Sequence, residues 1–364
     1  MSPESTVSSG SFDINKMEMS EVIRMYSRSS YQHPLFDPLQ DGKAKEHRRD
    51  DAASPISNSD STLGILQDLG FSQSNIDSEG FGKKLPLWSQ IIDNYGDRPV
   101  VLGLERCQAY RETVPVAKRI VGLAGLFSSG TNVMHHLLLN NCKPPEGGQK
   151  PQRSFQWQVP WGKHHPADTR MKYAARDREF LNQTAVLPVV TVRHPITWLN
   201  ALCRHGYSLH WDHNPDLCDA TLRLDQAVHA KFGYTNQSIV YDSLIDVWKD
   251  WNLAYFQQRK YPLLMTRLED IVYHPKQVVE EVCHCIGGKL HSDRPFSVFV
   301  SSMNDGKGHG EHRSSGLLST FVKFAKPMKE LSDKFSNDDW DIVKTVLQDD
   351  SHLLSSLNYR MPKG

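Results

Sequence analysis

The residues of this chain with the clearest chemical potential form a short loop that contains two glycines. Four residues separate Gly125 from Gly130, and Thr131 and Asn132 follow the second glycine. This is the spacing of a phosphate loop, in which backbone N–H groups and a helix N-terminus surround an anion. A loop for nucleoside triphosphates continues with Lys and then Ser or Thr, and no lysine stands here. The loop therefore suits a 5′-phosphate or a phosphosulfate better than ATP hydrolysis; the alternative is an ordinary turn between a strand and a helix.

A second group, Lys163-His164-His165-Pro166, contains residue types that can accept a proton and stabilise negative charge. A histidine suits the base because its pKa lies near neutrality. His165 or, as the alternative, His164 could be such a base. Lys163, on the same face as His165 in an extended segment, could be the cation for a transferred anionic group. The other interpretation is that both histidines are ordinary loop residues.

Two arginines each follow an apolar run. Arg193 stands before His-Pro195, and Arg267 begins Arg-Leu-Glu-Asp270. Arginine binds phosphate through two parallel hydrogen bonds, and ligands of parallel α/β sheets lie outside the carboxyl ends of the strands. Arg193 is therefore our candidate for a second phosphate, and a surface arginine beside a turn proline is the alternative.

The elements that must position these groups follow from hydrophobic periodicity and length. Strands that alternate with helices predict an α/β fold, with a parallel sheet covered by helices on both faces. The predicted strands are Ile120–Leu126, Ser154–Pro160, Leu187–Val192 and Tyr261–Thr266. The predicted helices are Leu85–Tyr95, Thr131–Leu139, Thr169–Asn182, Ile196–His205, Ser243–Arg259, His274–Ile286 and Trp340–Leu357.

Composition limits the remaining possibilities. The 364 residues include 42 Lys+Arg and 42 Asp+Glu, so bulk charge gives no case for nucleic-acid binding. Residues 1–85 are rich in Ser, Asp, Asn and Gly, which predicts a disordered tail, and residues 86–364 are expected to form the folded domain. No apolar run is long enough for a transmembrane segment, and no signal peptide is recognisable.

Six cysteines show no metal-ligand spacing, so no metal is expected. Cys283 and Cys285 are predicted to be two buried thiols on one helix. Asn182 and Asn236 each begin an Asn-x-Ser/Thr glycosylation pattern, which also arises by chance. The compartment therefore stays open between the cytoplasm and the Golgi lumen.

The order of these groups, over roughly residues 118–360, resembles the sulfotransferase family, which uses 3′-phosphoadenosine 5′-phosphosulfate as its donor. The loop after the first strand looks like the family's 5′-phosphosulfate loop, and Arg193-His-Pro looks like its 3′-phosphate element. Arg267-Leu-Glu-Asp is similar to the family's Arg-Tyr-Glu-Asp strand end, and Lys163-x-His165 resembles its Lys-x-His segment.

This resemblance implies a three-layer P-loop-type fold and transfer of a sulfuryl group to a hydroxyl of a carbohydrate or small molecule. It gives His165 and Lys163 catalytic roles, and it implies no metal. Loops 143–168 and 205–240 are expected to shape the acceptor site. The residues expected to bind the donor are Ser128, Ser129, Gly130, Thr131, Asn132, Arg193, Lys307 and Arg313.

The chain also departs from the family. Ser128 stands where most members have Lys or Arg, and Ala201 stands where a serine usually binds the 3′-phosphate. The late Arg-Lys-Gly loop is matched only partly, around Lys307, and Lys307 or Arg313 could supply the missing charge. Two rival functions follow: a non-catalytic nucleotide-binding protein, and a P-loop kinase or NTPase, against which the missing lysine argues.

Overall fold

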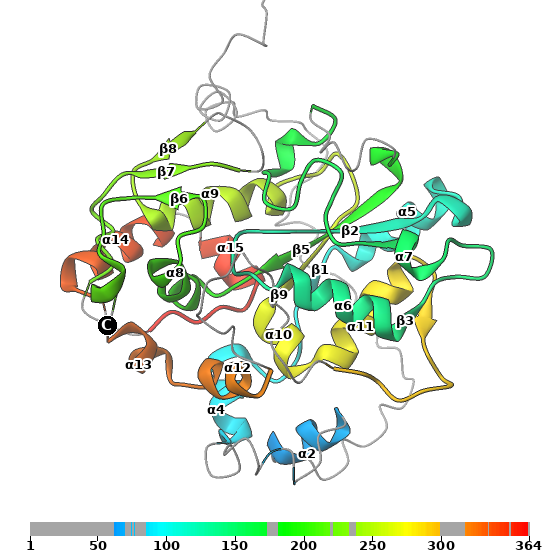
Figure 1. The fold of residues 1–364 in the computed structure, drawn as a ribbon, viewed down its shortest axis with the longest axis horizontal. Coiled ribbons are helices and arrows are strands. Elements are labelled where there is room, and N and C mark those ends of the chain that lie inside the picture. Colours follow the sequence, from blue (N-terminus) through cyan, green and yellow to red (C-terminus); the bar gives the residue numbers. More distant parts are fainter. Residues whose placement is uncertain are drawn as a thin grey trace, which may run out of the picture. The chain divides into compact units, whose positions relative to one another are not determined.

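A mostly parallel five-stranded sheet lies at the centre of a mixed α/β architecture (Figure 1). Its order is β1-β9-β5-β2-β4, and only β1 runs antiparallel to its neighbour. The computed structural model describes residues 62–69, 74, 76, 85–172, 181–218, 221–232, 238–298, 317–333, 335–348 and 351–362.

The described strands are β1 (Val101–Leu102), β2 (Ile120–Gly125), β3 (Cys142–Lys143), β4 (Phe155–Gln156), β5 (Val186–Val192), β6 (Leu209–His210), β7 (Val228–Ala230), β8 (Ile239–Tyr241), β9 (Leu264–Arg267) and β10 (Lys289–Leu290). The described helices are α2 (Thr62–Asp68), α4 (Trp88–Tyr95), α5 (Cys107–Thr113), α6 (Thr131–Asn141), α7 (Pro151–Ser154), α8 (Pro195–Arg204), α9 (Leu244–Phe256), α10 (Leu268–Tyr273), α11 (Pro275–Cys285), α12 (Leu317–Phe324), α13 (Met328–Ser332), α14 (Asn337–Gln348) and α15 (Ser351–Ser356).

Three of the strands bring the candidate residues to one edge of the sheet. Strands β2, β5 and β9 are entirely buried, as expected for apolar runs in a covered parallel sheet. The register pairs Gly125 with Thr191 and Val192 with Arg267, so the carboxyl ends of the three strands lie level. The glycine loop, Arg193 and Arg267 therefore leave the sheet at the same edge.

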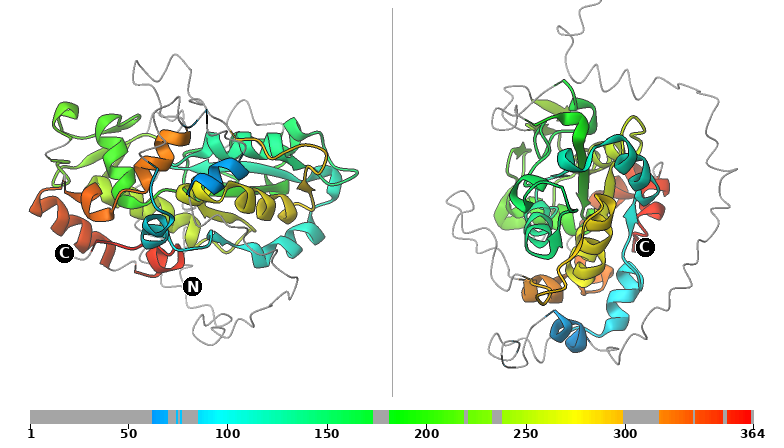
Figure 2. Two further views of the ribbon diagram at one scale, coloured as in Figure 1. Left: turned by 90° about the horizontal axis from the view of Figure 1, so that it is seen from below. Right: turned by 90° about the vertical axis from the view of Figure 1, so that its right-hand side faces the viewer.

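Helices pack against both faces of the sheet (Figure 1, Figure 2). Successive side chains of β2 alternate between two hydrophobic clusters, because a strand directs neighbouring side chains to opposite faces. Val121 and Leu123 pack with α6 and α11, whereas Ile120 and Ala124 belong to the cluster that contains α8 and α9. The predicted parallel arrangement of alternating strands and helices is confirmed at this level.

All six cysteines form disulfides, so the prediction of two buried thiols on one helix is wrong. Cys283 and Cys285 do lie on α11, but positions two apart on a helix point in directions about 200° apart and reach different neighbours. Their partners lie 141 and 178 residues away in sequence. The disulfides are Cys107–Cys285, Cys142–Cys283 and Cys203–Cys218.

The predicted tail also needs correction at its end. Residues 62–68 form α2, and the side chains of Leu66 and Ile76 are fully buried. Thr62 Oγ1 donates a hydrogen bond to the Pro86 carbonyl over 2.7 Å. A few apolar residues thus join the core, although the average composition of the segment is polar. Residues 1–61 of the predicted tail lie outside the described residues.

Several element boundaries differ from the predictions. The strand predicted over Ser154–Pro160 is reduced to β4, and the helix predicted over Trp340–Leu357 is divided into α14 and α15. Most of the helix predicted over Thr169–Asn182 falls on residues 173–180, which lie outside the described part of the chain. These differences change the lengths of elements and leave the predicted parallel sheet between helices in place.

Candidate anion-binding site

The loop between β2 and α6 requires both of its glycines. A Cβ atom at Gly125 would lie 2.6 Å from Thr191 Oγ1 and would collide with the Ser129 hydroxyl. Gly130 has a φ of +85°, a left-handed conformation that favours glycine, and a Cβ there would collide with Leu268. The spacing recognised in the sequence therefore reflects a loop packed closely against β5 and α10.

The two serines of the loop have different environments. Ser129 is buried; its Oγ donates to the Leu126 carbonyl over 2.7 Å and lies 3.2 Å from Thr191 Oγ1, so this hydroxyl fixes the loop to β5. Ser128 is half-buried with a φ of +59°, and its carbonyl accepts a hydrogen bond from Arg193 Nη1 over 3.2 Å. The loop and Arg193, both predicted to bind the donor, are thus in direct contact.

Lys163 lies at the first turn of α6. Its Nζ donates to Asn132 Oδ1 over 2.6 Å, and its backbone carbonyl accepts from the Gly125 N–H over 3.0 Å. The ammonium also lies 4.4 Å from the centroid of the Trp157 ring, which is 37% exposed. Burial lowers the pKa of Lys163 to about 8. Asn132 and Thr131 open α6, so a helix N-terminus and a lysine are brought to one place, a combination that favours anions.

His164, the alternative base of the sequence analysis, contacts the loop directly. Its Nδ1 lies 2.6 Å from the Gly125 carbonyl, and its ring lies 4.2 Å from the Phe127 ring between centroids. A carbonyl only accepts hydrogen bonds, which assigns the proton to Nδ1 and leaves Nε2 as an acceptor. Burial lowers the pKa of His164 to about 3, so the ring is neutral near pH 7.

His165, the base preferred in the sequence analysis, has different surroundings. It is 3% exposed, and its ring lies beside Gly162, where a Cβ atom would be 2.6 Å from the ring. Burial lowers the pKa of His165 to about 4, and the charge of Asp168 opposes that shift. Neither histidine keeps the near-neutral pKa expected of the base, so the choice between them rests on geometry. The geometry favours His164 for a role at the loop, and the catalytic role of His165 stays a prediction.

Arg193 follows β5 and precedes α8, which begins at Pro195, one residue before the predicted start. The residue is 7% exposed, and its guanidinium donates from Nε to Thr197 Oγ1 over 3.1 Å and lies 5.0 Å from the Phe324 ring centroid. Burial lowers the pKa of Arg193, and the nearby Glu269 charge acts in the opposite direction. Arg193 is thus a buried cation at the edge of the sheet and not a surface residue beside a turn.

A pocket of about 340 Å³ lies along α8, and Arg193 contacts two of its lining residues, Thr197 and Phe324. Three basic residues contribute to its wall, together with one carboxylate, Glu330, which forms an ion pair with Lys326. Asn200 lines the pocket and donates to the Leu331 carbonyl over 2.8 Å, whereas Ala201 is not among the lining residues. The lining residues are Thr197, Asn200, Arg204, Cys218, Lys323, Phe324, Lys326, Glu330 and Leu331.

Arg267 forms a structural ion pair. Its Nε and Nη2 each lie 2.6 Å from one carboxylate oxygen of Asp270, and both side chains are essentially unexposed. Its Nη1 donates to the carbonyls of Leu357 and Asn358. The Arg-Leu-Glu-Asp motif therefore fixes the chain after α15 to the end of β9.

Tyr207 is a candidate site residue that the sequence analysis missed. Its hydroxyl lies 3.3 Å from Ser128 Oγ, and its ring stacks on Phe127 at 5.4 Å between centroids. It belongs to the segment expected to shape an acceptor site, but no local pattern marks it. A second pocket, of about 320 Å³, lies at this segment. Its lining residues are Cys203, Arg204, His205, Gly206, Tyr207, Leu209, His210, Trp211, His213 and Pro215.

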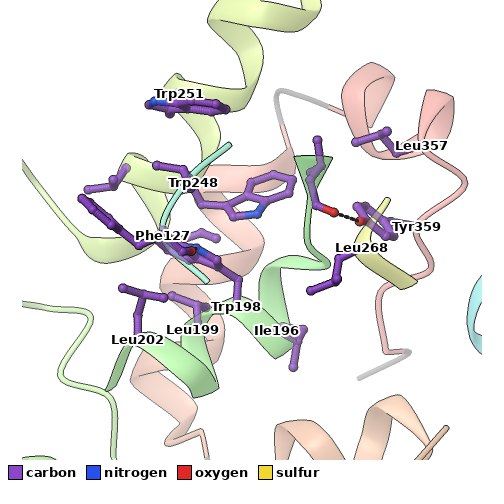
Figure 3. Close-up of a cluster of buried hydrophobic side chains, with 14 of the residues drawn as sticks. Phe127, Ile196, Trp198, Leu199, Leu202, Trp248, Trp251, Leu268, Leu357 and Tyr359 are labelled. Carbon is purple, nitrogen blue, oxygen red and sulfur yellow. Dashed lines mark hydrogen bonds between the residues drawn. The ribbon is translucent and has the colours of Figure 1, made fainter. Parts of the chain in front are cut away.

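Two buried tryptophans, Trp198 and Trp248, lie in the hydrophobic cluster that contains Phe127 of the loop (Figure 3), and their indoles hold the loop and the arginine segment in place. Trp198 Nε1 donates to the Phe127 carbonyl over 2.8 Å, and Trp248 Nε1 donates to the Arg193 carbonyl over 2.9 Å. Trp248 is buried in the core, and its indole also positions the backbone of Arg193.

Lys307 and Arg313, proposed as donor-binding cations, lie outside the described residues. Among the residues that the structure describes, no group of three or more His, Cys, Asp or Glu could hold a metal ion. Within the same part of the chain, no helix has the length and apolar character needed to span a membrane. No protein-family model, curated protein or solved structure matches this chain.

Proposed function

We propose that this chain is a sulfotransferase with a three-layer P-loop-type fold, which moves a sulfuryl group from 3′-phosphoadenosine 5′-phosphosulfate to a hydroxyl. The acceptor class is a carbohydrate or small molecule. One observation carries the proposal: two buried cations flank the glycine loop. Arg193 contacts the loop through the Ser128 carbonyl, and Lys163 contacts the first turn of α6 through Asn132.

The donor carries anionic groups at its 5′ and 3′ positions and therefore needs two anion sites. The loop and the N-terminus of α6 are suited to the 5′-phosphosulfate. Arg193 and the basic pocket along α8 are suited to the 3′-phosphate, because arginine and lysine provide charge-assisted hydrogen bonds to phosphate oxygens. In this assignment Asn200, which lines the pocket, takes the place of the serine that is missing at Ala201.

The transfer step uses the neighbours of the loop. His164 Nε2 accepts the proton of the acceptor hydroxyl while the acceptor oxygen forms a bond to sulfur. The bond between sulfur and the bridging phosphate oxygen breaks, and 3′-phosphoadenosine 5′-phosphate leaves with the electron pair. Lys163 stabilises charge on the sulfuryl oxygens and compensates for the cation that Ser128 does not supply.

The acceptor is assigned to the side of the loop that carries Tyr207. The Tyr207 hydroxyl lies near Ser128. The pocket that Tyr207 lines is also lined by Trp211 and by several histidines. Aromatic faces and ring nitrogens suit an acceptor with a ring and several hydroxyls, such as a sugar.

The test is a transfer assay with sulfur-labelled donor and a panel of sugar and phenol acceptors, with magnesium-ATP hydrolysis measured in parallel. Label transfer without ATP turnover is expected. ATP hydrolysis without label transfer would favour the kinase or NTPase alternative.

A non-catalytic nucleotide-binding protein is the second candidate, and Ser128 in place of the usual cation favours it. Binding of 3′-phosphoadenosine 5′-phosphate without transfer to any acceptor would support that function. The substitution Ser128→Lys is then the rescue to attempt, because it restores the charge at the loop.

A further inference from the structure

The three disulfides indicate the kind of compartment in which the chain folds. All six cysteines are paired, and two of the bridges fix α11 to parts of the chain that precede it by 178 and 141 residues. Stable disulfides of this kind form in oxidising compartments and are rare where glutathione and thioredoxin keep thiols reduced. An oxidising lumen is also where asparagine side chains receive glycans.

One of the two glycosylation patterns can be assessed in the structure. Asn182 and Thr184 are both exposed, in the turn that precedes β5. Asn182 Oδ1 accepts hydrogen bonds from the Thr184 N–H over 3.0 Å and from the Thr184 hydroxyl over 2.7 Å. Asn182 Nδ2 makes no hydrogen bond with any residue that the structure describes, so substitution at this nitrogen breaks no such bond. Asn236, which begins the other pattern, lies outside the described residues.

The position of Asn182 is compatible with the proposed function and does not depend on it. Asn182 precedes the amino end of β5, whereas Arg193 follows its carboxyl end. Seven strand residues span about 23 Å. A glycan on Asn182 is therefore attached at the end of the strand opposite to the anion site.

We propose that Asn182 is an N-glycosylation site, used when the chain passes through an oxidising lumen. The co-reactant is a lipid-linked oligosaccharide diphosphate. The Asn182 amide nitrogen forms a bond to the anomeric carbon of the glycan and loses one proton, and the lipid diphosphate leaves with the electron pair of the broken bond. Transfer takes place on the emerging chain, and the exposed turn leaves room for the glycan once the domain has folded.

The test uses the full chain, expressed behind a cleavable secretory leader in eukaryotic cells and mapped as peptides by mass spectrometry. The expected result is a glycan on the Asn182 peptide that peptide N-glycosidase removes. The six cysteines should react with an alkylating agent only after their disulfides are reduced. Asn182→Gln and Thr184→Ala should each abolish that glycan. Thr184→Ser should retain it, and Asn236→Gln should leave it unchanged.

If Asn182→Gln prevents folding, the two substitutions at residue 184 still test the proposal, because Thr184→Ala should abolish the glycan and Thr184→Ser should retain it. An unmodified Asn182 in secreted protein with three intact disulfides would overturn the glycosylation site. Thiols that alkylate without reduction in the same protein would overturn the oxidising lumen on which the proposal also rests. Loss of transfer activity alone would bear on the proposed function and not on this inference.

Discussion

Two buried arginines follow the same pattern at neighbouring strand ends, yet their partners differ. Arg267, at the end of β9, binds Asp270 through two hydrogen bonds of 2.6 Å, and this pairing raises its pKa against the effect of burial. Arg193, just beyond the end of β5, donates to a hydroxyl and a carbonyl and lies against the Phe324 ring, and burial lowers its pKa.

Glu269, the carboxylate whose charge acts on Arg193, forms hydrogen bonds with other groups. Glu269 accepts hydrogen bonds from the His194 N–H over 3.0 Å and from the Tyr359 hydroxyl over 2.9 Å. Binding of an anionic ligand at Arg193 is therefore expected to be favourable, because a bidentate phosphate contact is stronger than a hydrogen bond to a neutral group. The comparison indicates that Arg267 stabilises the fold, and it supports our proposal that Arg193 binds an anionic ligand.

The largest effect is expected when the ion pair of Arg267 is broken. Arg267→Ala leaves the Asp270 carboxylate buried without its main partner and should lower the free energy of unfolding by about 3–5 kcal/mol. Chemical denaturation measures this loss. The matched control is Arg223→Ala, which removes an exposed pair with Asp225 and should cost under about 1 kcal/mol. Equal losses of unfolding free energy in the two variants would contradict the structural role of Arg267.

The next effect concerns catalysis beside the loop. His164→Ala should lower the rate of sulfuryl transfer by about 10²–10⁴, the usual contribution of a positioned base, with little change in donor affinity. His165→Ala is the matched control and should lower the rate much less, since its ring lies beside Gly162. Steady-state rates with labelled donor distinguish the two. A large loss only in His165→Ala would restore the assignment made from the sequence.

Arg193→Ala should separate ligand binding from stability. Affinity for 3′-phosphoadenosine 5′-phosphate should fall by about 1.5–3 kcal/mol, because one charge-assisted contact is lost. Affinity for adenosine 5′-phosphate should change much less, since that ligand has no 3′-phosphate. The destabilisation should also be smaller than in Arg267→Ala. Equal losses of affinity for the two nucleotides would place Arg193 away from the 3′-phosphate.

The smallest effect is a pH dependence of donor binding. Because burial lowers the pKa of Lys163 to about 8, its ammonium is charged below that pH and neutral above it. Affinity for the donor, whose sulfuryl oxygens Lys163 is proposed to contact, should therefore decrease as the pH rises through about 8, by at most tenfold per pH unit. Lys163→Arg should bind with little change over the same range, because arginine keeps its charge. The same decrease in both proteins would exclude Lys163 as its cause.

The sequence was sufficient for features that depend on local pattern. The apolar run from Ile120 predicts β2 with its end misplaced by one residue, and the helix predicted from Ile196 is α8, which begins one residue earlier. The histidine positions were less predictable, because alternation between faces holds only for an extended segment. In the structure the His165 N–H donates to the Gly162 carbonyl over 3.1 Å, so this segment turns and the alternation rule fails.

Contacts between distant parts of the chain could not be predicted. The hydrogen bond from Lys163 to Asn132 spans 31 residues, the one from Arg193 to Ser128 spans 65, and two disulfides span more than 140. Each depends on how the helices pack on the sheet. Nothing in the residues near Tyr207 indicates its position beside Ser128.

Calorimetric titration of the full chain with 3′-phosphoadenosine 5′-phosphate and with ATP tests the central claim most directly. Two anion sites, one at the loop and one at Arg193, predict that the bisphosphate binds more tightly than ATP and that magnesium does not reverse this order. Tighter binding of magnesium-ATP, or no binding of the bisphosphate, would contradict the assignment of Arg193 and the loop to one nucleotide site.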